Sequence, residues 1–274
     1  MLAYDLSTGY IVRLKSHSVH GKPMKNTPDT KQHPGIYLLP NLFTTSGLFA
    51  GFYAIVAAMN GRFESACIAI FIAMLTDMLD GRVARMTGTE SAFGAEYDSL
   101  TDMVAFGVAP ALVIYSWGLS DLGKLGWLVA FLHAAGMALR LARFNTQIGK
   151  SDKRFFVGLP APAAAGVLVG YVWLQTDFDM PRNASYVGAI LTFIVSVCMV
   201  STLRYYSFKD IDLKGKVPYL AILAVVMIFV GISVHPPTVL FSAFVIYALS
   251  GPLWTIWRLR GLRGIRRFMA FWKR

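Results

Sequence analysis

Four aspartates lie in two segments of this chain that are otherwise apolar enough to cross a lipid bilayer. They are Asp77, Asp80, Asp98 and Asp102. A carboxylate at membrane depth costs about 2.5–3.5 kcal/mol on insertion scales unless it faces a polar cavity, a partner or a metal ion. Four of them together indicate a functional site, and structural salt bridges with nearby arginines are the less favoured explanation.

The spacing of the aspartates places them on two helix faces. Asp77 and Asp80 are three residues apart on the first segment, so they share one side of a helix. Asp98 and Asp102 are four residues apart on the second segment and do the same. The stretch between them, residues 86–93, is short enough to make the two helices antiparallel neighbours. We therefore expect the two acidic faces to meet near one surface of the membrane.

Carboxylates that meet in this way repel one another unless a strong positive charge joins them, and hard divalent cations take oxygen ligands of this kind. Two Mg²⁺ or Mn²⁺ ions would neutralise the cluster. With Arg82 and Arg85 close by, such ions would bind a pyrophosphate and would suit in-line displacement at phosphorus. Gly81 and Gly94 leave room for a nucleotide to approach the backbone. The alternative from another class is an ion or metabolite transporter that binds its substrate at the aspartates.

The rest of the sequence is that of a polytopic helical membrane protein. Of its 274 residues, 55% are hydrophobic and 15% are charged. Apolar segments of about 20 residues, the length of a membrane-spanning helix, predict eight spans, at 39–59, 65–85, 95–117, 124–145, 157–175, 185–206, 217–234 and 238–257. We therefore expect an all-α fold in three parts: a cytoplasmic N-terminal tail over 1–38, a transmembrane catalytic domain over 39–257 and a basic amphipathic C-terminal tail over 258–274.

Basic residues are concentrated on one side of these spans. The tails and the turns on the side of the aspartates carry all of the 26 Lys and Arg residues except Arg62, Lys124 and Arg182. The positive-inside rule then places both termini and the acidic cluster in the cytoplasm. The arginines and aromatic residues of 258–274 are typical of a helix that lies against anionic membrane lipids. We expect no nucleic-acid partner.

The segment that carries the aspartates also resembles a known family. It reads Asp77-Met-Leu-Asp80-Gly81-Arg-Val-Ala84-Arg85 and, after eight further residues, Gly94-Ala-Glu-Tyr-Asp98-Ser-Leu-Thr-Asp102. This is similar to the D-x-x-D-G-x-x-A-R…G-x-x-x-D-x-x-x-D signature of the CDP-alcohol phosphatidyltransferases, and Pro40-Asn41-Leu-Phe-Thr44 resembles the start of that family's first span. The resemblance implies the fold of that family, CDP-diacylglycerol as donor and CMP as leaving group. It also implies a homodimer in the inner (cytoplasmic) membrane of a bacterium.

The same resemblance implies roles for individual residues. Asp77, Asp80 and Asp98 correspond to metal ligands. Asp102 corresponds to a further ligand or to the base that takes the proton of the acceptor alcohol. The positions that correspond to nucleotide-binding residues are Gly81, Ala84, Arg85 and Gly94.

Three shorter stretches on the same side of the membrane resemble the membrane-type phosphatidylserine synthases. They are Ala142-Arg143-Phe144-Asn145, Gly158-Leu-Pro160 and Ser207-Phe-Lys209. This resemblance implies L-serine as the acceptor, whose carboxylate needs cationic donors. The candidate serine-binding residues are Arg143, Asn145, Arg204, Ser207 and Lys209. Anchoring of helix ends is the alternative role for these cations, and glycerol 3-phosphate or inositol phosphate is the alternative acceptor.

Overall fold

The computed structural model describes residues 2–4, 11–13, 38–146, 155–178, 183–207 and 219–272. The chain divides into two units, Met1–Pro34 and Gly35–Arg274. In the first unit, β1 (Leu2–Tyr4) pairs antiparallel with β2 (Ile11–Arg13). The second unit contains the helices and the aspartates.

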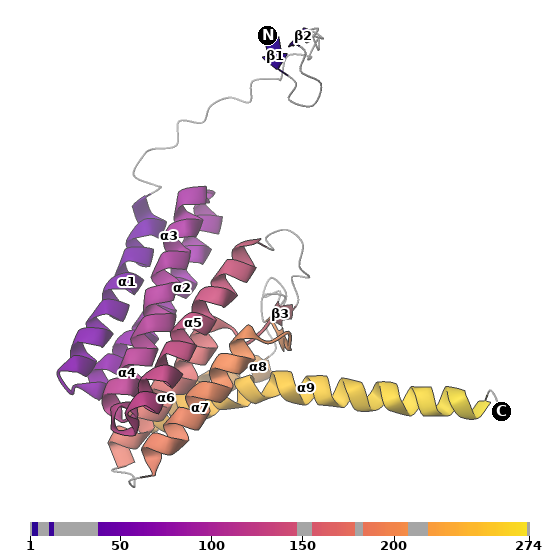
Figure 1. Cartoon of the computed structure of the whole chain (residues 1–274). Helices are drawn as coiled ribbons and strands as arrows, with labels where there is room; N and C mark the ends of the chain where they lie inside the picture. The colour runs from indigo at the N-terminus through magenta and orange to yellow at the C-terminus, as the bar shows by residue number, and fades with distance from the viewer. Residues whose placement is uncertain are drawn as a thin grey trace. The chain divides into compact units, whose positions relative to one another are not determined.

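The described part of the second unit is built almost entirely from helices, as the composition predicted (Figure 1). The elements in chain order are α1 (Leu38–Met59), α2 (Phe63–Thr87), α3 (Ala92–Asp102), a π-helix (Met103–Val108), α4 (Ala109–Trp117), a 3₁₀ turn (Leu119–Leu122), α5 (Lys124–Thr146), α6 (Ala161–Phe178), α7 (Ala184–Val200), α8 (Tyr219–Val234) and α9 (Pro236–Trp272). A helix therefore occupies every segment in which a span was predicted. The third of those segments is shared by α3, the π-helix and α4.

Four helical segments of the described chain are long and apolar enough to cross a membrane. They are Leu39–Met59, Ala92–Trp117, Lys124–Thr146 and Pro236–Trp257. α7 is apolar but shorter. The chain is thus a polytopic helical membrane protein, and the count of eight spans stays a prediction. α9 continues without a break from the last of these spans into the predicted C-terminal tail.

Two of the predicted span ends are strands instead of helix. β3 (Phe155–Val157) pairs antiparallel with β4 (Arg204–Tyr206). The predicted spans 157–175 and 185–206 were therefore wrong at these ends, since α6 begins after β3 and α7 ends before β4. Aromatic and β-branched residues fill most of both strands, and such residues suit a pleated, half-buried surface.

Gly158 directly follows β3 and packs against the end of α7. Its φ of 81° lies in the left-handed region, which a glycine adopts without steric cost. Its N–H donates to the carbonyl of Leu203 at 2.8 Å. A Cβ at this position would overlap the carbonyl oxygen of Met199. The strand pair is therefore held against the C-terminal end of α7 by a residue that accepts no side chain.

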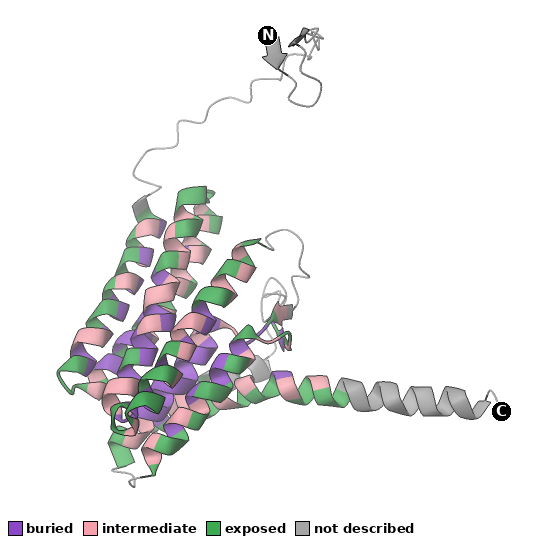
Figure 2. Ribbon diagram, viewed as in Figure 1, coloured by how far each residue is buried: buried purple, intermediate pink, exposed green. Residues whose placement is uncertain are grey.

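Small residues allow the helices of the core to approach one another closely. α6 is buried along most of its length and contacts α2, α4, α7 and α9, and Figure 2 shows the buried residues gathered inside the bundle. On α1, a Cβ at Gly51 would lie only 2.8 Å from the Cα of Ala105 in the π-helix. Large apolar side chains such as Phe49 and Phe131 are mostly exposed on the outside, as a lipid-facing surface requires.

Candidate metal and nucleotide site

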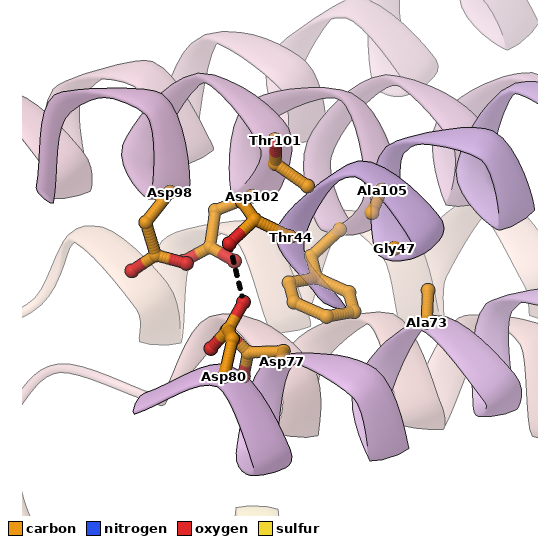
Figure 3. A pocket seen from close by; sticks show the side chains of 10 residues that line it. Thr44, Gly47, Ala73, Asp77, Asp80, Asp98, Thr101, Asp102 and Ala105 are labelled. Atoms are coloured by element: carbon orange, nitrogen blue, oxygen red, sulfur yellow. Dashed lines mark hydrogen bonds between the residues drawn. The ribbon is translucent and has the colours of Figure 1, made fainter. Parts of the chain in front are cut away.

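Three of the four aspartates meet in one cluster. Asp77 on α2 and Asp98 and Asp102 on α3 each offer a carboxylate oxygen, and these oxygens all lie within 4.8 Å of one another. Figure 3 shows the carboxylates of the two helices turned toward each other. All three residues are partly buried. The two acidic helix faces therefore meet as their spacing predicted.

Asp80 lies beside this cluster and is held by α1. Its side chain is buried, with a relative exposure of 6%. The hydroxyl of Thr44 lies 2.9 Å from Asp80 Oδ2, a hydrogen bond drawn as a dashed line in Figure 3. α1 packs against both α2 and α3, which brings Thr44 to this position. A hydroxyl donor stabilises the ionised form of a buried carboxylate, so Thr44 contributes to keeping Asp80 charged.

A pocket opens among these side chains, and all four aspartates line it. Its lining residues are Thr44, Gly47, Ala73, Asp77, Asp80, Asp98, Thr101, Asp102, Ala105 and Phe106. Thr101 Oγ1 is buried without a hydrogen-bond partner among the described residues. A buried hydroxyl without a partner is costly, so the polar side of the pocket suits a polar or charged occupant.

The turn between α2 and α3 sets the approach of the two acidic faces. α2 ends at Thr87, and α3 begins at Ala92 after Ser91. The Ser91 hydroxyl accepts a hydrogen bond of 3.0 Å from the backbone N–H of Gly94, which satisfies one of the free donors at the helix start. Asp98 and Asp102 follow one and two turns further along α3.

A π-helix follows Asp102 directly. Such wide turns are rare and occur often at functional sites. The buried ring of His133 on α5 crosses to this segment, where its Nε2–H donates to the carbonyl of Phe106 at 3.2 Å. Its Nδ1 lies 3.4 Å from the hydroxyl of Ser196 on α7. α5 and α7 thus support the segment that continues from Asp102.

The residues of the cluster fit a divalent cation. They supply only carboxylate oxygens, which are the ligands preferred by Mg²⁺ and Mn²⁺. Asp77 and Asp98 are the charged groups that repel the Asp102 carboxylate most strongly, and a cation bound between the three would remove that repulsion. Asp77, Asp98 and Asp102 are therefore the residues of the described chain that would hold the ion.

The predicted nucleotide-binding positions lie along α2 and at the start of α3. A Cβ at Gly81 would meet no atom nearer than Arg85 Nη1, at 3.5 Å, so the backbone of Gly81 is open. Arg85 is exposed and close enough to Asp80 for their charges to attract. Ala84 and Gly94 are partly buried. Nucleotide contact at these four positions stays a prediction.

Arg143 forms hydrogen bonds with the C-terminal end of α7. Its guanidinium donates to the carbonyl oxygens of Val200, Met199 and Ser201, at 2.9, 3.3 and 3.4 Å respectively. The last carbonyls of a helix lack partners within the helix, and a cation stabilises them. The structure therefore gives Arg143 the work of a helix cap, the alternative that the sequence left open. Serine binding by Arg143 stays a prediction.

The other candidate serine-binding residues in the described chain lie on α5, on β4 and directly after β4. Asn145 Nδ2 donates to the hydroxyl of Ser99 on α3 at 3.3 Å, and Arg204 is exposed on β4. Ser207 is 1% exposed, and its Oγ has no partner among the described residues. Lys209 lies outside the described residues.

Sequence reasoning gave no site role to Thr44, His133 or Arg140. The signal for Thr44 was present, because it closes the Pro-Asn-x-x-Thr stretch at the start of α1. A buried histidine in an apolar helix gives no sign of the carbonyl that it reaches. Arg140 stood among the cations at the end of α5, and only the fold shows that its charge acts most strongly with Asp102.

Comparison with known proteins gives a consistent result. The sequence profile of the CDP-alcohol phosphatidyltransferase family matches residues 37–203. A CDP-diacylglycerol–serine O-phosphatidyltransferase of Helicobacter pylori strain 26695 is 39% identical over 71% of this chain and 83% of its own length. One from Mycobacterium tuberculosis strain H37Rv is 36% identical over 81% and 79%. An archaetidylserine synthase of Methanothermobacter thermautotrophicus is 38% identical over 61% and 69%.

The fold and the site define a polytopic helical membrane protein with a carboxylate cluster suited to a divalent cation. The chain belongs to the CDP-alcohol phosphatidyltransferase family, because the family profile covers more than half of it and several relatives align over most of its length. It is therefore a transferase of phospholipid synthesis.

Proposed function

We propose that this protein transfers the phosphatidyl group of CDP-diacylglycerol to the hydroxyl of L-serine, which yields phosphatidylserine and CMP. The observation that carries the proposal is the meeting of Asp77, Asp98 and Asp102 within 4.8 Å in the segment of the family signature. The names of the relatives in Helicobacter and Mycobacterium support serine as the acceptor.

All four aspartates take part in binding divalent cations in this proposal. Asp77, Asp98 and Asp102 would hold the divalent cation, with Asp80 positioned by Thr44 to take part in binding a second one. The cations that these aspartates would hold would supply charge to neutralise the pyrophosphate and the leaving group. Arg85, next to the open backbone of Gly81, adds a guanidinium for the nucleotide phosphate.

In the reaction, the Asp102 carboxylate takes the proton of the serine hydroxyl. The serine oxygen forms a bond to the phosphorus that carries diacylglycerol, and the bond from that phosphorus to the CMP oxygen breaks. CMP leaves with the electron pair. Apolar residues line one side of the pocket, which limits the access of water as a competing acceptor.

The test is an assay of CMP release by the purified protein in detergent. CDP-diacylglycerol, Mn²⁺ and a panel of acceptors are supplied: L-serine, glycerol 3-phosphate and inositol phosphate. We expect CMP with serine at a rate at least tenfold above the other acceptors. Faster release with a phosphate-bearing acceptor would reassign the acceptor, and no CMP with any of them would favour a transporter.

We further propose that the acidic cluster faces the cytoplasm from the inner membrane and that the enzyme is a homodimer, with the catalytic domain over 39–257. The distribution of Lys and Arg supports the orientation. Arg62 and Met86 are both exposed at opposite ends of α2. On intact cells, an impermeant thiol reagent should label Arg62→Cys and leave Met86→Cys unlabelled. The reverse labelling pattern would invert the proposed orientation.

The homodimer is tested separately: light scattering of the purified protein in detergent should give twice the mass of one chain.

A further inference from the structure

Arg140 on α5 is a partly buried cation whose charge acts on the acidic cluster. Among titratable neighbours, Asp102 acts on its guanidinium most strongly, followed by Arg143, Tyr247 and Asp77. Its Nε is shielded from solvent and has no hydrogen-bond partner among the described residues. A buried charged donor without a partner is costly. The position therefore suits a ligand that supplies an acceptor.

The two arginines that the sequence favoured for an acceptor carboxylate are placed differently. Arg143 lies one turn further along α5, and its donors go to three backbone carbonyls at the end of α7. Arg204 is exposed on β4. Of these three arginines, Arg140 is the one with a buried nitrogen that lacks a partner and with a charge that acts on Asp102.

Tyr247 connects Arg140 to α9 and to the strand β4. Tyr247 on α9, whose hydroxyl interacts with the charge of Arg140, donates to the carbonyl of Tyr206 at 3.1 Å. The buried Tyr205 hydroxyl donates to the carbonyl of Ala248 at 3.1 Å, which fixes β4 on the same helix. Ser207, the residue after Tyr206, is buried with an Oγ that lacks a partner among the described residues. Ser207 Oγ is therefore a second polar atom without a partner, and it lies next to the contact between β4 and α9.

We propose that Arg140 binds the carboxylate of the amino-acid acceptor. This rests on the proposed function, in which two divalent cations neutralise the four aspartates and leave Arg140 without a compensating charge. A planar guanidinium matches a carboxylate through two parallel N–H bonds. In serine the hydroxyl is only two carbon atoms from the carboxylate carbon. An acceptor held at Arg140 can thus present its hydroxyl to Asp102, the group with which Arg140 interacts most strongly.

The test compares acceptors with and without a carboxylate. Steady-state CMP release is measured for the wild type, Arg140→Met and Arg140→Lys, with L-serine and with serinamide, and the KM for CDP-diacylglycerol is measured in parallel. Arg62→Met is the control, because Arg62 is exposed and lies at the start of α2, whereas the aspartates lie toward the end of that helix.

We expect Arg140→Met to raise the KM for serine by about tenfold or more, the loss that corresponds to one charged hydrogen bond. The preference for serine over serinamide should disappear, while the KM for CDP-diacylglycerol changes by less than about twofold. Arg140→Lys should also raise the serine KM, since an ammonium lacks the planar pair of donors. Arg62→Met should match the wild type.

An unchanged serine KM in Arg140→Met would overturn the assignment. An equal rise in the KM for CDP-diacylglycerol would also overturn it and would give Arg140 to the donor phosphates. If Arg140→Met does not fold, Arg140→Lys decides the matter, and a wild-type serine KM in that variant contradicts the proposal. Failure of the wild type to release CMP with serine, by contrast, would remove the proposed function itself.

Discussion

Thr44→Val removes the hydroxyl that Asp80 needs while keeping the size of the side chain. The hydroxyl lies 2.9 Å from Asp80 Oδ2, and Asp80 is only 6% exposed, so water replaces the lost donor poorly. A hydrogen bond to a charged group contributes about 1.5–3 kcal/mol, and each 1.36 kcal/mol is a factor of ten in rate. If Asp80 must be ionised in the transition state, kcat/KM for CDP-diacylglycerol should fall between about 10-fold and about 150-fold.

The assay is CMP release at saturating serine with varied CDP-diacylglycerol, together with thermal unfolding in detergent. Thr44→Ser keeps the hydroxyl and should stay near the wild type. Thr176→Val is the matched control, because among the described residues the Thr176 hydroxyl donates only to the Val172 carbonyl within its own helix. The reasoning is refuted if Thr44→Val and Thr176→Val have the same kcat/KM, or if Thr44→Ser loses as much activity as Thr44→Val.

Two further predictions concern the helices that support Asp102. Gly51→Val should lower the unfolding temperature and CMP release together, because its Cβ would lie 2.8 Å from the Ala105 Cα; overpacking of this kind costs about 1–3 kcal/mol, and wild-type stability in a thermal melt would contradict the close approach of α1. His133→Leu leaves the Phe106 carbonyl without its donor and should destabilise the protein by about 1–3 kcal/mol. Denaturant unfolding measures this loss, and an unchanged midpoint would show that the π-helix does not need the histidine.

The placement of the aspartates could be predicted because it depends on local rules. Intervals of three and four residues fix the faces of α2 and α3, and the short turn after Thr87 leaves few ways to connect the two helices. The apolar segments likewise predicted where helices form. These signals lie within about 25 residues of sequence and need no knowledge of the rest of the fold.

The features that the sequence did not predict depend on contacts between distant segments. The strands β3 and β4 pair across 47 positions, from Val157 to Arg204, and their apolar residues extended the neighbouring helical patterns. The Phe106 carbonyl in the π-helix accepts its hydrogen bond from His133 on α5. Arg143 caps the C-terminal end of α7, which lies more than 50 residues further along the chain. Residue types at helix ends therefore indicated cations but not which of them face the site.

The most direct test of the central claim is a titration of the purified protein with Mn²⁺, with the free ion followed by electron paramagnetic resonance. The claim is that Asp77, Asp98 and Asp102 form a divalent-cation site. We predict saturable binding by the wild type, at least tenfold weaker binding by Asp98→Asn, and unchanged binding by Asp121→Asn, whose aspartate is exposed in the 3₁₀ turn. Mn²⁺ binding by Asp98→Asn that equals the wild type, in a protein with a normal thermal melt, would contradict the account.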